Sequence, residues 1–282
     1  MIEVLHSGVL SSIQDLGRYH YRHFGVPLSG VMDQYSSSYA NIVIQNNSDS
    51  AVLEITMIGP KLRFKKPTVI CISGAVIQPQ INNKAISMYT PINIKVNDIL
   101  SFGKLEFGLR AYIAVKGGFK SEYILGSYAM YAGITKQHQL KAGDIIEYNT
   151  FESNASVKTA KIKYNQAVIS ENTLEAYPAP EFSHLDTQQK HLLLNSEFKI
   201  SKYYDRMAYR LEGFPKNNLP SILTSGVMPG TVQLTPSGEL IVLMRDAQTT
   251  GGYPRILQLS NQSMNILSQK KMNEAVKFKY LK

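Results

Sequence analysis

The sequence predicts a mainly β fold of the barrel or sandwich type, with a few short helices. Three apolar runs of strand length carry this prediction: residues 68–73, residues 110–115 and residues 239–244. Glycines follow the first two runs, and a Pro-Ser-Gly turn precedes the third. Short apolar runs bounded by turn residues are typical of buried strands, and many of them favour a closed or layered β architecture.

Helical patterns are confined to two segments. In residues 33–46, Asp33 can cap a helix, and tyrosine and aliphatic side chains follow at helical spacing. Residues 262–269 form a second, shorter candidate. We therefore expect helices to be a minor part of the fold.

Length and composition narrow the class of protein. A chain of 282 residues with 44% hydrophobic and 18% charged residues can form one large domain or two packed ones, and it is not disordered. The single cysteine, Cys71, excludes a disulfide framework, and its place in an apolar run predicts a buried, inert thiol. Neither an export signal nor a membrane-spanning run is visible, so we expect a cytoplasmic protein without membrane contact.

The charge balance is basic, with 30 Lys and Arg against 21 Asp and Glu, a net of +9. Such a balance can indicate nucleic-acid binding when the charges form one patch. Here the lysines are scattered over residues 61–66, 158–163 and 270–282, and no nucleic-acid motif accompanies them. We therefore expect no nucleic-acid partner. General solubility or an acidic partner subunit is the favoured explanation of the charge, and an anionic substrate is a third possibility.

A polar stretch over residues 149–172 interrupts the rhythm of the strands. Polar, irregular segments commonly connect the compact parts of a chain. We therefore predict an N-terminal half over residues 1–150, an exposed connecting segment over residues 151–172, and a C-terminal half over residues 173–282.

Three polar clusters lie beside glycines, in residues 14–33, 205–210 and 245–254, and each combines Arg with Asp. A guanidinium can bind a carboxylate or phosphate ligand through two parallel hydrogen bonds. The same residues can equally form an internal ion pair that fixes a loop. The residues alone leave both interpretations open.

The glycines of residues 249–252 also allow two interpretations. Backbone amides there can approach an anion closely, because glycine has no side chain. A tight turn is favoured, since the phosphate-loop signature GxxxxGK[ST] is absent. His20 and His23 are too few for a metal site, and no GxSxG elbow supports a hydrolase triad.

A series of different, longer motifs extends along nearly the whole chain. In the N-terminal half they are residues 14–18, 25–27, 29–33, 40–41, 53–54, 59–60, 73–75, 110–112, 117–118 and 125–127. In the C-terminal half they are residues 205–207, 209–211, 213, 225–226, 229–231, 233 and 246–254. Together these motifs resemble the biotin-dependent carboxyltransferase-like family, which includes the C subunit of 5-oxoprolinase and the matching part of urea carboxylase.

The resemblance implies a cyclophilin-like β-barrel architecture in two packed halves. It also implies a role as the C subunit of an ATP-dependent 5-oxoprolinase, which opens 5-oxo-L-proline to L-glutamate. A kinase-inhibitor-like B subunit would be the direct partner and the A subunit would complete the reaction, so we expect the chain to be inactive alone. ATP with Mg²⁺ would act in the assembled complex, and no biotin would be attached to this chain.

The resemblance further suggests the residues of the site. The candidate catalytic groups, which would orient the substrate or act as bases, are Asp15, Asp205 and Asp246. The candidate substrate-binding residues are Arg18, Arg206, Arg210, Gln233, Gln248, Thr249, Thr250, Gly251 and Gly252. Arg206 and Arg210 are four positions apart, so they would share one face of a helix or a strand and converge on one anion.

The chain departs from the family pattern at some positions, and two other functions stay open. Tyr128 replaces an arginine of the family pattern, and Ala208 replaces a glycine. The loss of an arginine removes one possible contact to an anion.

One alternative function is a carboxyltransferase subunit that works with a biotinylated partner, as in urea carboxylase. The other is a non-enzymatic regulator that binds a kinase-inhibitor-like B subunit.

Overall fold

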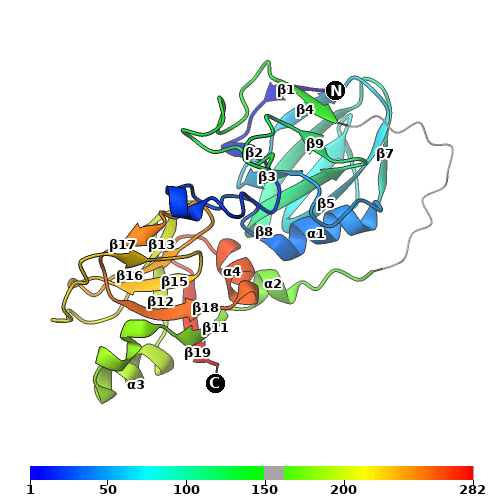
Figure 1. The fold of residues 1–282 in the computed structure, drawn as a ribbon. Coiled ribbons are helices and arrows are strands. Elements are labelled where there is room, and N and C mark those ends of the chain that lie inside the picture. Colours follow the sequence, from blue (N-terminus) through cyan, green and yellow to red (C-terminus); the bar gives the residue numbers. More distant parts are fainter. Residues whose placement is uncertain (149–161, 282) are drawn as a thin grey trace. The chain divides into compact units, whose positions relative to one another are not determined.

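The computed structural model describes residues 1–148 and 162–281. Contacts divide the chain into two compact units (Figure 1). Unit 1 contains Met1–Arg18 and Ser29–Ile169, and unit 2 contains Tyr19–Leu28 and Ser170–Lys282. This division differs from the predicted halves, because an early segment folds with unit 2 and unit 1 continues past residue 150 to Ile169.

Unit 1 is built on one antiparallel sheet with the strand order β2-β3-β8-β4-β1-β10-β9, in which β5 also pairs with β8 and carries β6 and β7. Its strands are β1 (Ile2–His6), β2 (Leu10–Gln14), β3 (Val52–Thr56), β4 (Lys61–Phe64), β5 (Thr68–Ile81), β6 (Lys84–Ala85), β7 (Ile92–Ile94), β8 (Ile99–Val115), β9 (Phe119–Lys120) and β10 (Ile145–Tyr148). The side chains at the centre of its core are at most 1% exposed: Ile2, Val4, Leu62, Phe64, Ile70, Ile72 and Ile113.

Strands β5 and β8 are longer than the apolar runs over residues 68–73 and 110–115 predicted. The glycine that was expected to end the first strand, Gly74, lies inside β5, at a shift in the register with β8. Its φ is +82°, and a Cβ there would approach the Arg110 carbonyl oxygen to 2.5 Å. Glycine therefore allows a bulge here rather than an end of the strand.

Helix α1 (Gln34–Val43) packs against β5 and β8, and it confirms the helix predicted over residues 33–46 (Figure 1). The Asp33 carboxylate caps it by accepting a hydrogen bond from the Ser36 amide at 3.0 Å. Cys71 is buried in the apolar cluster beside this helix, and burial raises the pKa of its thiol to about 12. The thiol is therefore protonated and inert at neutral pH, as predicted.

The described part of the predicted connection, residues 162–172, is exposed at most positions, but three buried side chains anchor it. Tyr164, Val168 and Ile169 are at most 7% exposed, and the last two lie in the short helix α2 (Ala167–Ser170). The Tyr39 hydroxyl donates a hydrogen bond to the Ile162 carbonyl at 2.7 Å, which ties this segment to α1. Residues 149–161 of the predicted connection lie outside the described residues.

Unit 2 is a closed barrel with the strand order β11-β18-β15-β16-β13-β12-β19, in which β11 and β19 run parallel. Its strands are β11 (Thr173–Pro178), β12 (Phe198–Tyr204), β13 (Ala208–Glu212), β15 (Thr231–Leu234), β16 (Leu240–Leu243), β18 (Arg255–Leu259) and β19 (Ala275–Tyr280). A separate ribbon pairs β14 (Ser225–Gly226) with β17 (Thr250–Gly251). Its helical elements are η1 (Arg22–Phe24), η2 (Pro180–His184), α3 (Thr187–Asn195) and α4 (Asn261–Ser268).

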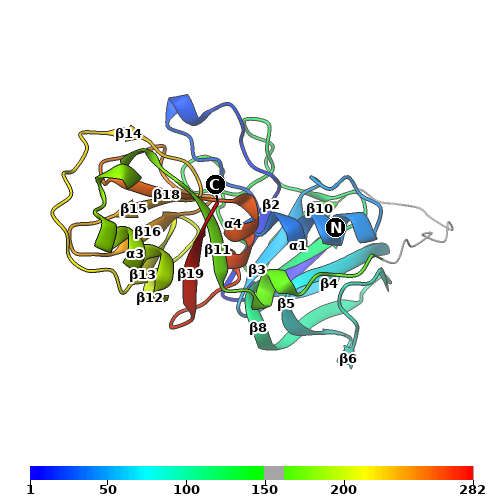
Figure 2. The same ribbon diagram turned by 90° about the horizontal axis from the view of Figure 1, so that it is seen from below.

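Helix α3 packs against β19, and α4 packs against β11 (Figure 2). The strand predicted over residues 239–244 and the helix predicted over residues 262–269 are confirmed as β16 and α4. Helix α3 was not predicted, although Asp186 and Gln189 form a capping box at its start. It buries only Leu193 within its span, so it has almost no apolar face for the sequence to reveal.

The prediction of a mainly β chain with barrel-like sheets and few short helices is confirmed. Within the part of the chain that the structure describes, no helix combines the length and the apolar character needed to cross a membrane.

We predict that Phe64→Ala destabilises unit 1 by about 3–5 kcal/mol, because it removes a fully buried ring from the core. The matched control is Phe107→Ala, since the Phe107 side chain in β8 is 44% exposed and should cost much less. Urea unfolding of both variants measures the difference. Equal losses of stability would contradict the assignment of the core.

Candidate functional site

Four of the predicted site residues line one pocket of about 460 Å³ in unit 2. We call it the hairpin pocket, because the β12–β13 hairpin forms one wall. Asp205 and Arg210 come from this hairpin, Gln233 from β15, and Gln248 from the segment after β16. The remaining lining residues are Lys202, Tyr203, Tyr204, Met207, Ala208, Ile241, Leu243 and Tyr253.

Arg206 and Asp246 form an internal ion pair rather than a substrate site. The Arg206 Nε donates to one carboxylate oxygen of Asp246 at 2.8 Å, and Nη2 donates to the other at 3.0 Å. The two side chains are 10% and 12% exposed. The backbone adds a hydrogen bond from the Asp246 amide to the Arg206 carbonyl at 2.9 Å. The interpretation as a loop-fixing pair, left open by the sequence, therefore applies to these residues.

The predicted convergence of Arg206 and Arg210 does not occur. Arg206 lies in the bend before β13, whereas Arg210 lies within the strand. Residues four apart share a face only when both belong to one regular strand or helix, so the expectation does not apply here. The Arg210 side chain is 45% exposed, 3.5 Å from Glu239 and 5.4 Å above the Tyr203 ring. The Arg210 guanidinium thus forms only a weak, partly exposed ion pair, and it is accessible from the hairpin pocket.

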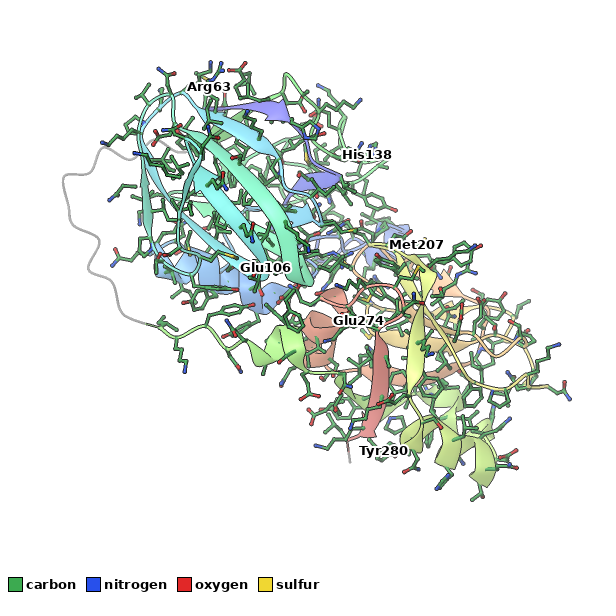
Figure 3. All side chains as sticks on the ribbon, turned by 180° about the vertical axis from the view of Figure 1, so that it is seen from behind. Arg63, Glu106, His138, Met207, Glu274 and Tyr280 are labelled. Atoms are coloured by element: carbon green, nitrogen blue, oxygen red, sulfur yellow. The ribbon has the colours of Figure 1, made fainter. Side chains whose placement is uncertain are left out.

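Asp205 shapes the hairpin turn. One of its carboxylate oxygens accepts hydrogen bonds from the amides of Met207 at 2.7 Å and Ala208 at 3.0 Å. This is the local pattern by which Asp stabilises a turn. The turn presents Met207 at its tip, with 47% of the residue exposed (Figure 3).

The glycines of residues 249–252 form neither a phosphate loop nor the favoured tight turn. Thr250 and Gly251 make up β17, which pairs with β14. A Cβ on Gly251 would approach the Gln233 Nε2 to 2.5 Å. Glycine is therefore needed so that Gln233 can pass and donate to the Tyr253 carbonyl at 3.2 Å. The Gly252 carbonyl accepts a hydrogen bond from the Ile222 amide at 3.0 Å.

A second pocket of unit 2, of about 650 Å³, lies where Thr249 and Thr250 meet the early segment of the chain. We call it the threonine pocket. Its lining residues are Arg22, His23, Gly25, Gly226, Val227, Met228, Thr249 and Thr250. The sequence did not predict Arg22 as a site residue, because nothing in it indicates that residues 19–28 fold with the C-terminal unit.

Asp15 and Arg18 make hydrogen bonds that fix a loop in unit 1. The Asp15 carboxylate accepts hydrogen bonds from the Ser127 hydroxyl at 2.6 Å and the Tyr128 amide at 2.6 Å. Arg18 is fully buried and donates to the Ala129 carbonyl. The Asp15 carboxylate binds the backbone amide of residue 128, so this hydrogen bond is kept although Tyr128 replaces the arginine of the family pattern.

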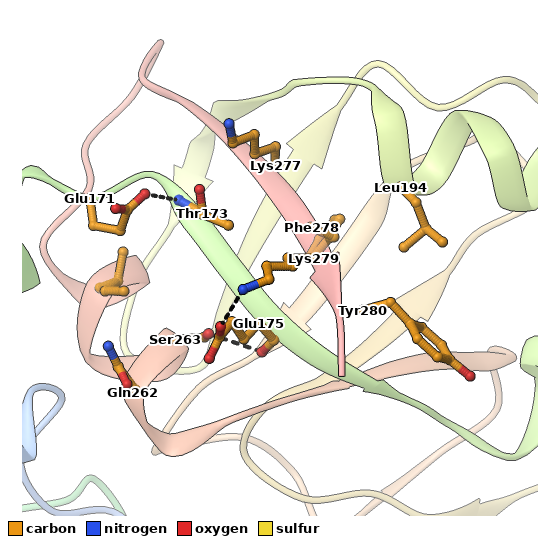
Figure 4. Close-up of a pocket in the computed structure, with 11 residues that line it drawn as sticks. Glu171, Thr173, Glu175, Leu194, Gln262, Ser263, Lys277, Phe278, Lys279 and Tyr280 are labelled. Atoms are coloured by element: carbon orange, nitrogen blue, oxygen red, sulfur yellow. Dashed lines mark hydrogen bonds and ion pairs between the residues drawn. The ribbon is translucent and has the colours of Figure 1, made fainter. Parts of the chain in front are cut away.

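A third pocket of unit 2, of about 580 Å³, contains none of the predicted residues (Figure 4). It lies along β11 and β19, beside α4. Lys279 forms an ion pair with Glu175 at 3.1 Å, and the Thr173 amide donates to Glu171 at 2.8 Å. Lys279, Glu175 and Glu171 are thus engaged with other groups of the pocket, and we assign it no site role.

The carboxylates near the first two pockets do not fit a Mg²⁺–nucleotide site. Such a site usually takes one or two protein carboxylates. Asp246 is paired with Arg206, Glu239 lies beside Arg210, and Asp205 accepts backbone amides. Among the described residues, no group of three His, Cys, Asp or Glu could hold a metal ion. The residues that line these two pockets are therefore assigned no role in holding a nucleotide.

We predict that Asp246→Asn lowers the stability of unit 2 by about 3–5 kcal/mol, because it leaves a largely buried guanidinium without its counter-charge. The matched control, Glu239→Gln, breaks an exposed ion pair and should cost less than about 1 kcal/mol. Chemical denaturation measures both. If the two variants were equally stable, Arg206 and Asp246 would not be scaffold residues.

A second ion pair predicts sensitivity of unit 2 to acid. Arg255 donates to Glu181 at 2.8 Å and holds the pKa of this carboxyl below its usual 4.5. The stability that the carboxylate contributes is present above pH 4.5 and is lost as the pH falls through the lowered folded-state pKa. We expect Glu181→Gln to reduce the Tm at neutral pH, and the difference from wild type to shrink on acidification.

Thermal melts at a series of pH values check this expectation. Glu175→Gln is the control, since its ion pair with Lys279 is largely exposed and should hardly affect the Tm. A difference between Glu181→Gln and wild type that stays constant down to strongly acidic pH would be inconsistent with the proposed linkage.

Comparisons with known proteins agree with the fold. A family model described as carboxyltransferase domain, subdomain A and B, matches residues 24–280. The C subunits of 5-oxoprolinase from Haemophilus influenzae and Escherichia coli are each 28% identical, over 99% of this chain and 90% of the relative. A urea amidolyase of Saccharomyces cerevisiae is 35% identical over 93% of this chain, which corresponds to 15% of that protein.

Among solved structures, the urea amidolyase of K. lactis superposes with a TM-score of 0.89 and 29% sequence identity. The match covers all of this chain but only 19% of that enzyme. The fold and the ordered motifs thus occur in a part of larger enzymes as well as in proteins of similar length. From the match over residues 24–280, the chain belongs to the family of carboxyltransferase domains with subdomains A and B.

Proposed function

We propose that the chain is the C subunit of an ATP-dependent 5-oxoprolinase, which acts with the A and B subunits to open 5-oxo-L-proline to L-glutamate. The observation that carries the proposal is the extent of the matches. The relatives named for the C subunit of 5-oxoprolinase are matched over 90% of their length, whereas the urea amidolyases are matched over 9% and 15% of theirs. The match thus covers nearly the whole of these C subunits but only a part of the urea amidolyases.

The hairpin pocket supplies groups that suit a lactam. Opening the stable amide ring places negative charge on its oxygen, and a nearby cation would stabilise that charge. Arg210 and Lys202 are the accessible cations of this pocket, since Arg206 is engaged with Asp246. The Gln248 Oε1 is buried without a hydrogen-bond partner among the described residues, and it would accept the lactam N–H after a small side-chain rotation.

In this proposal the chain binds and orients the ring, while ATP with Mg²⁺ is held elsewhere in the assembled complex. The carboxylates of the pocket are committed to other partners, which supports that division of roles. Activation of the amide by phosphoryl transfer would then depend on the A and B subunits, and the B subunit would be the direct partner.

We predict that the purified chain alone forms no glutamate from 5-oxo-L-proline and ATP, and that the chain mixed with the A and B subunits does. The physical reason is that the described residues offer no self-sufficient nucleotide site or nucleophile. Glutamate formation is measured with each of the three proteins omitted in turn. Steady turnover by the chain alone, or equal turnover by the A and B subunits without it, would reject the proposal.

A second candidate is a carboxyltransferase subunit that works with a biotinylated partner. The similarity to the K. lactis urea amidolyase, with a TM-score of 0.89, favours it. Pull-down with streptavidin after expression of the tagged chain separates the two functions, because only the carboxyltransferase requires a biotin carrier. A stable complex with the B subunit that has no turnover when the A subunit is added would instead favour a regulatory role.

A further inference from the structure

Arg22 is held in place by a short, well-defined turn. It is the first residue of η1, and the Gly25 amide donates to its carbonyl at 2.9 Å. Gly25 has a φ of +81°, which suits glycine and ends the turn. The Arg22 Nη2 donates to the Val227 carbonyl, so the side chain links the segment Tyr19–Leu28 to the residue that follows β14.

The charge of Arg22 has no partner of opposite sign among the described residues. Its Nη1 is buried and makes no hydrogen bond to any of them, and no carboxylate pairs with it. Burial lowers the pKa of Arg22 from its usual value, although an arginine remains protonated at neutral pH. A buried, charged donor without an acceptor is unfavourable, and an anion would relieve it.

The other walls of the threonine pocket offer further donors. Neither the Thr249 nor the Thr250 hydroxyl hydrogen-bonds to another of the described residues. Around Gly25 and Gly226 there is open space, with no atom within 4 Å of a Cβ placed on either. The pocket is thus accessible beside a cation and two hydroxyl groups.

The neighbouring arginine provides a contrast. Arg255 donates through Nη1 to the Gly226 carbonyl at 3.0 Å, much as Arg22 donates to Val227. Its charge is balanced by Glu181, which it contacts through two nitrogen atoms at 2.8 and 2.9 Å. Of these two arginines, therefore, Arg22 is the one that lacks a counter-charge.

We propose that the threonine pocket binds the carboxylate of a small monoanionic ligand, held by the Arg22 guanidinium and the hydroxyls of Thr249 and Thr250. A carboxylate fits because it is planar and carries one charge, which matches a single guanidinium. A phosphate dianion would bring twice the charge to the same cation. The two pockets share no lining residue, so this carboxylate site is separate from the hairpin pocket in which the lactam ring is proposed to bind, and it rests on the proposed function only for the choice of 5-oxo-L-proline as the probe.

The test is an NMR titration of the full chain with 5-oxo-L-proline, with the neutral lactam 2-pyrrolidinone, and with inorganic phosphate. We expect 5-oxo-L-proline to shift the amides of Gly226, Thr249 and Thr250, and to bind more tightly than the other two probes. Arg22→Gln should weaken its binding about 10- to 100-fold, as expected for a lost charge-assisted hydrogen bond. Arg22→Lys, which keeps the charge but loses the planar fork, should give an intermediate affinity.

Arg63→Gln is the matched control, because it removes the same charge from an exposed side chain in unit 1 (Figure 3). It should bind 5-oxo-L-proline as wild type does. Thr250→Val guards against a folding defect of the Arg22 variants, since Thr250 is exposed and its replacement should weaken binding severalfold without lowering the Tm.

The assignment is overturned if wild type binds no 5-oxo-L-proline, if phosphate binds more tightly, or if a folded Arg22→Gln and Thr250→Val both bind normally. The two proposals fail separately. If carboxylate binding depends on Arg22 but the complete complex forms no glutamate, the assignment of this pocket stands and the proposed 5-oxoprolinase function is rejected. Glutamate formation by the complete complex, without Arg22-dependent carboxylate binding by this chain, would do the reverse.

Discussion

The ion pair between Arg206 and Asp246 is the interaction on which both pockets of the candidate site depend. It joins the bend of the β12–β13 hairpin to the segment that follows β16, and the Asp246 amide and the Met244 amide add backbone hydrogen bonds to the same bend. From this junction the chain continues through Gln248 into the hairpin pocket and through Thr249 and Thr250 into the threonine pocket. A two-pronged contact between largely buried groups restricts the orientation of both side chains, so the positions of these residues follow from it.

The arginines of unit 2 differ in how completely their charge is balanced. Arg206 and Arg255 each meet a carboxylate through two nitrogen atoms, Arg210 meets one at longer range and with more exposure, and Arg22 meets none among the described residues. This gradient separates arginines that hold the protein together from arginines that remain available to a ligand. It depends on partners that are distant in sequence, such as Glu181 and Arg255, and a short Arg-Asp motif does not contain that information.

Local patterns predicted the elements whose cause is local. The Asp33 cap with its helix, the strand over residues 239–244 and the inert Cys71 follow from spacing and composition, and the structure contains them. The long strands β5 and β8 were underestimated because Gly74 can end a strand or form a bulge, and only the approach of the Arg110 carbonyl decides between them. In the candidate site, Gln233 and Gln248 line the same pocket and Asp15 and Arg18 fix a loop. Arg22 was missed because its neighbours are set by a long-range contact.

The membership of Tyr19–Leu28 in unit 2 has a consequence for how this protein can be divided and inherited. The chain passes from one unit to the other after Arg18, again after Leu28, and finally after Ile169. No single cut in the gene separates the two units, since a cut after Ile169 leaves Tyr19–Leu28 on the fragment that holds unit 1, and a fragment that starts at Ser170 lacks the turn that carries Arg22. Recombination that exchanges one unit between relatives would therefore break a pocket wall, so the two units are expected to be transmitted together as one indivisible module.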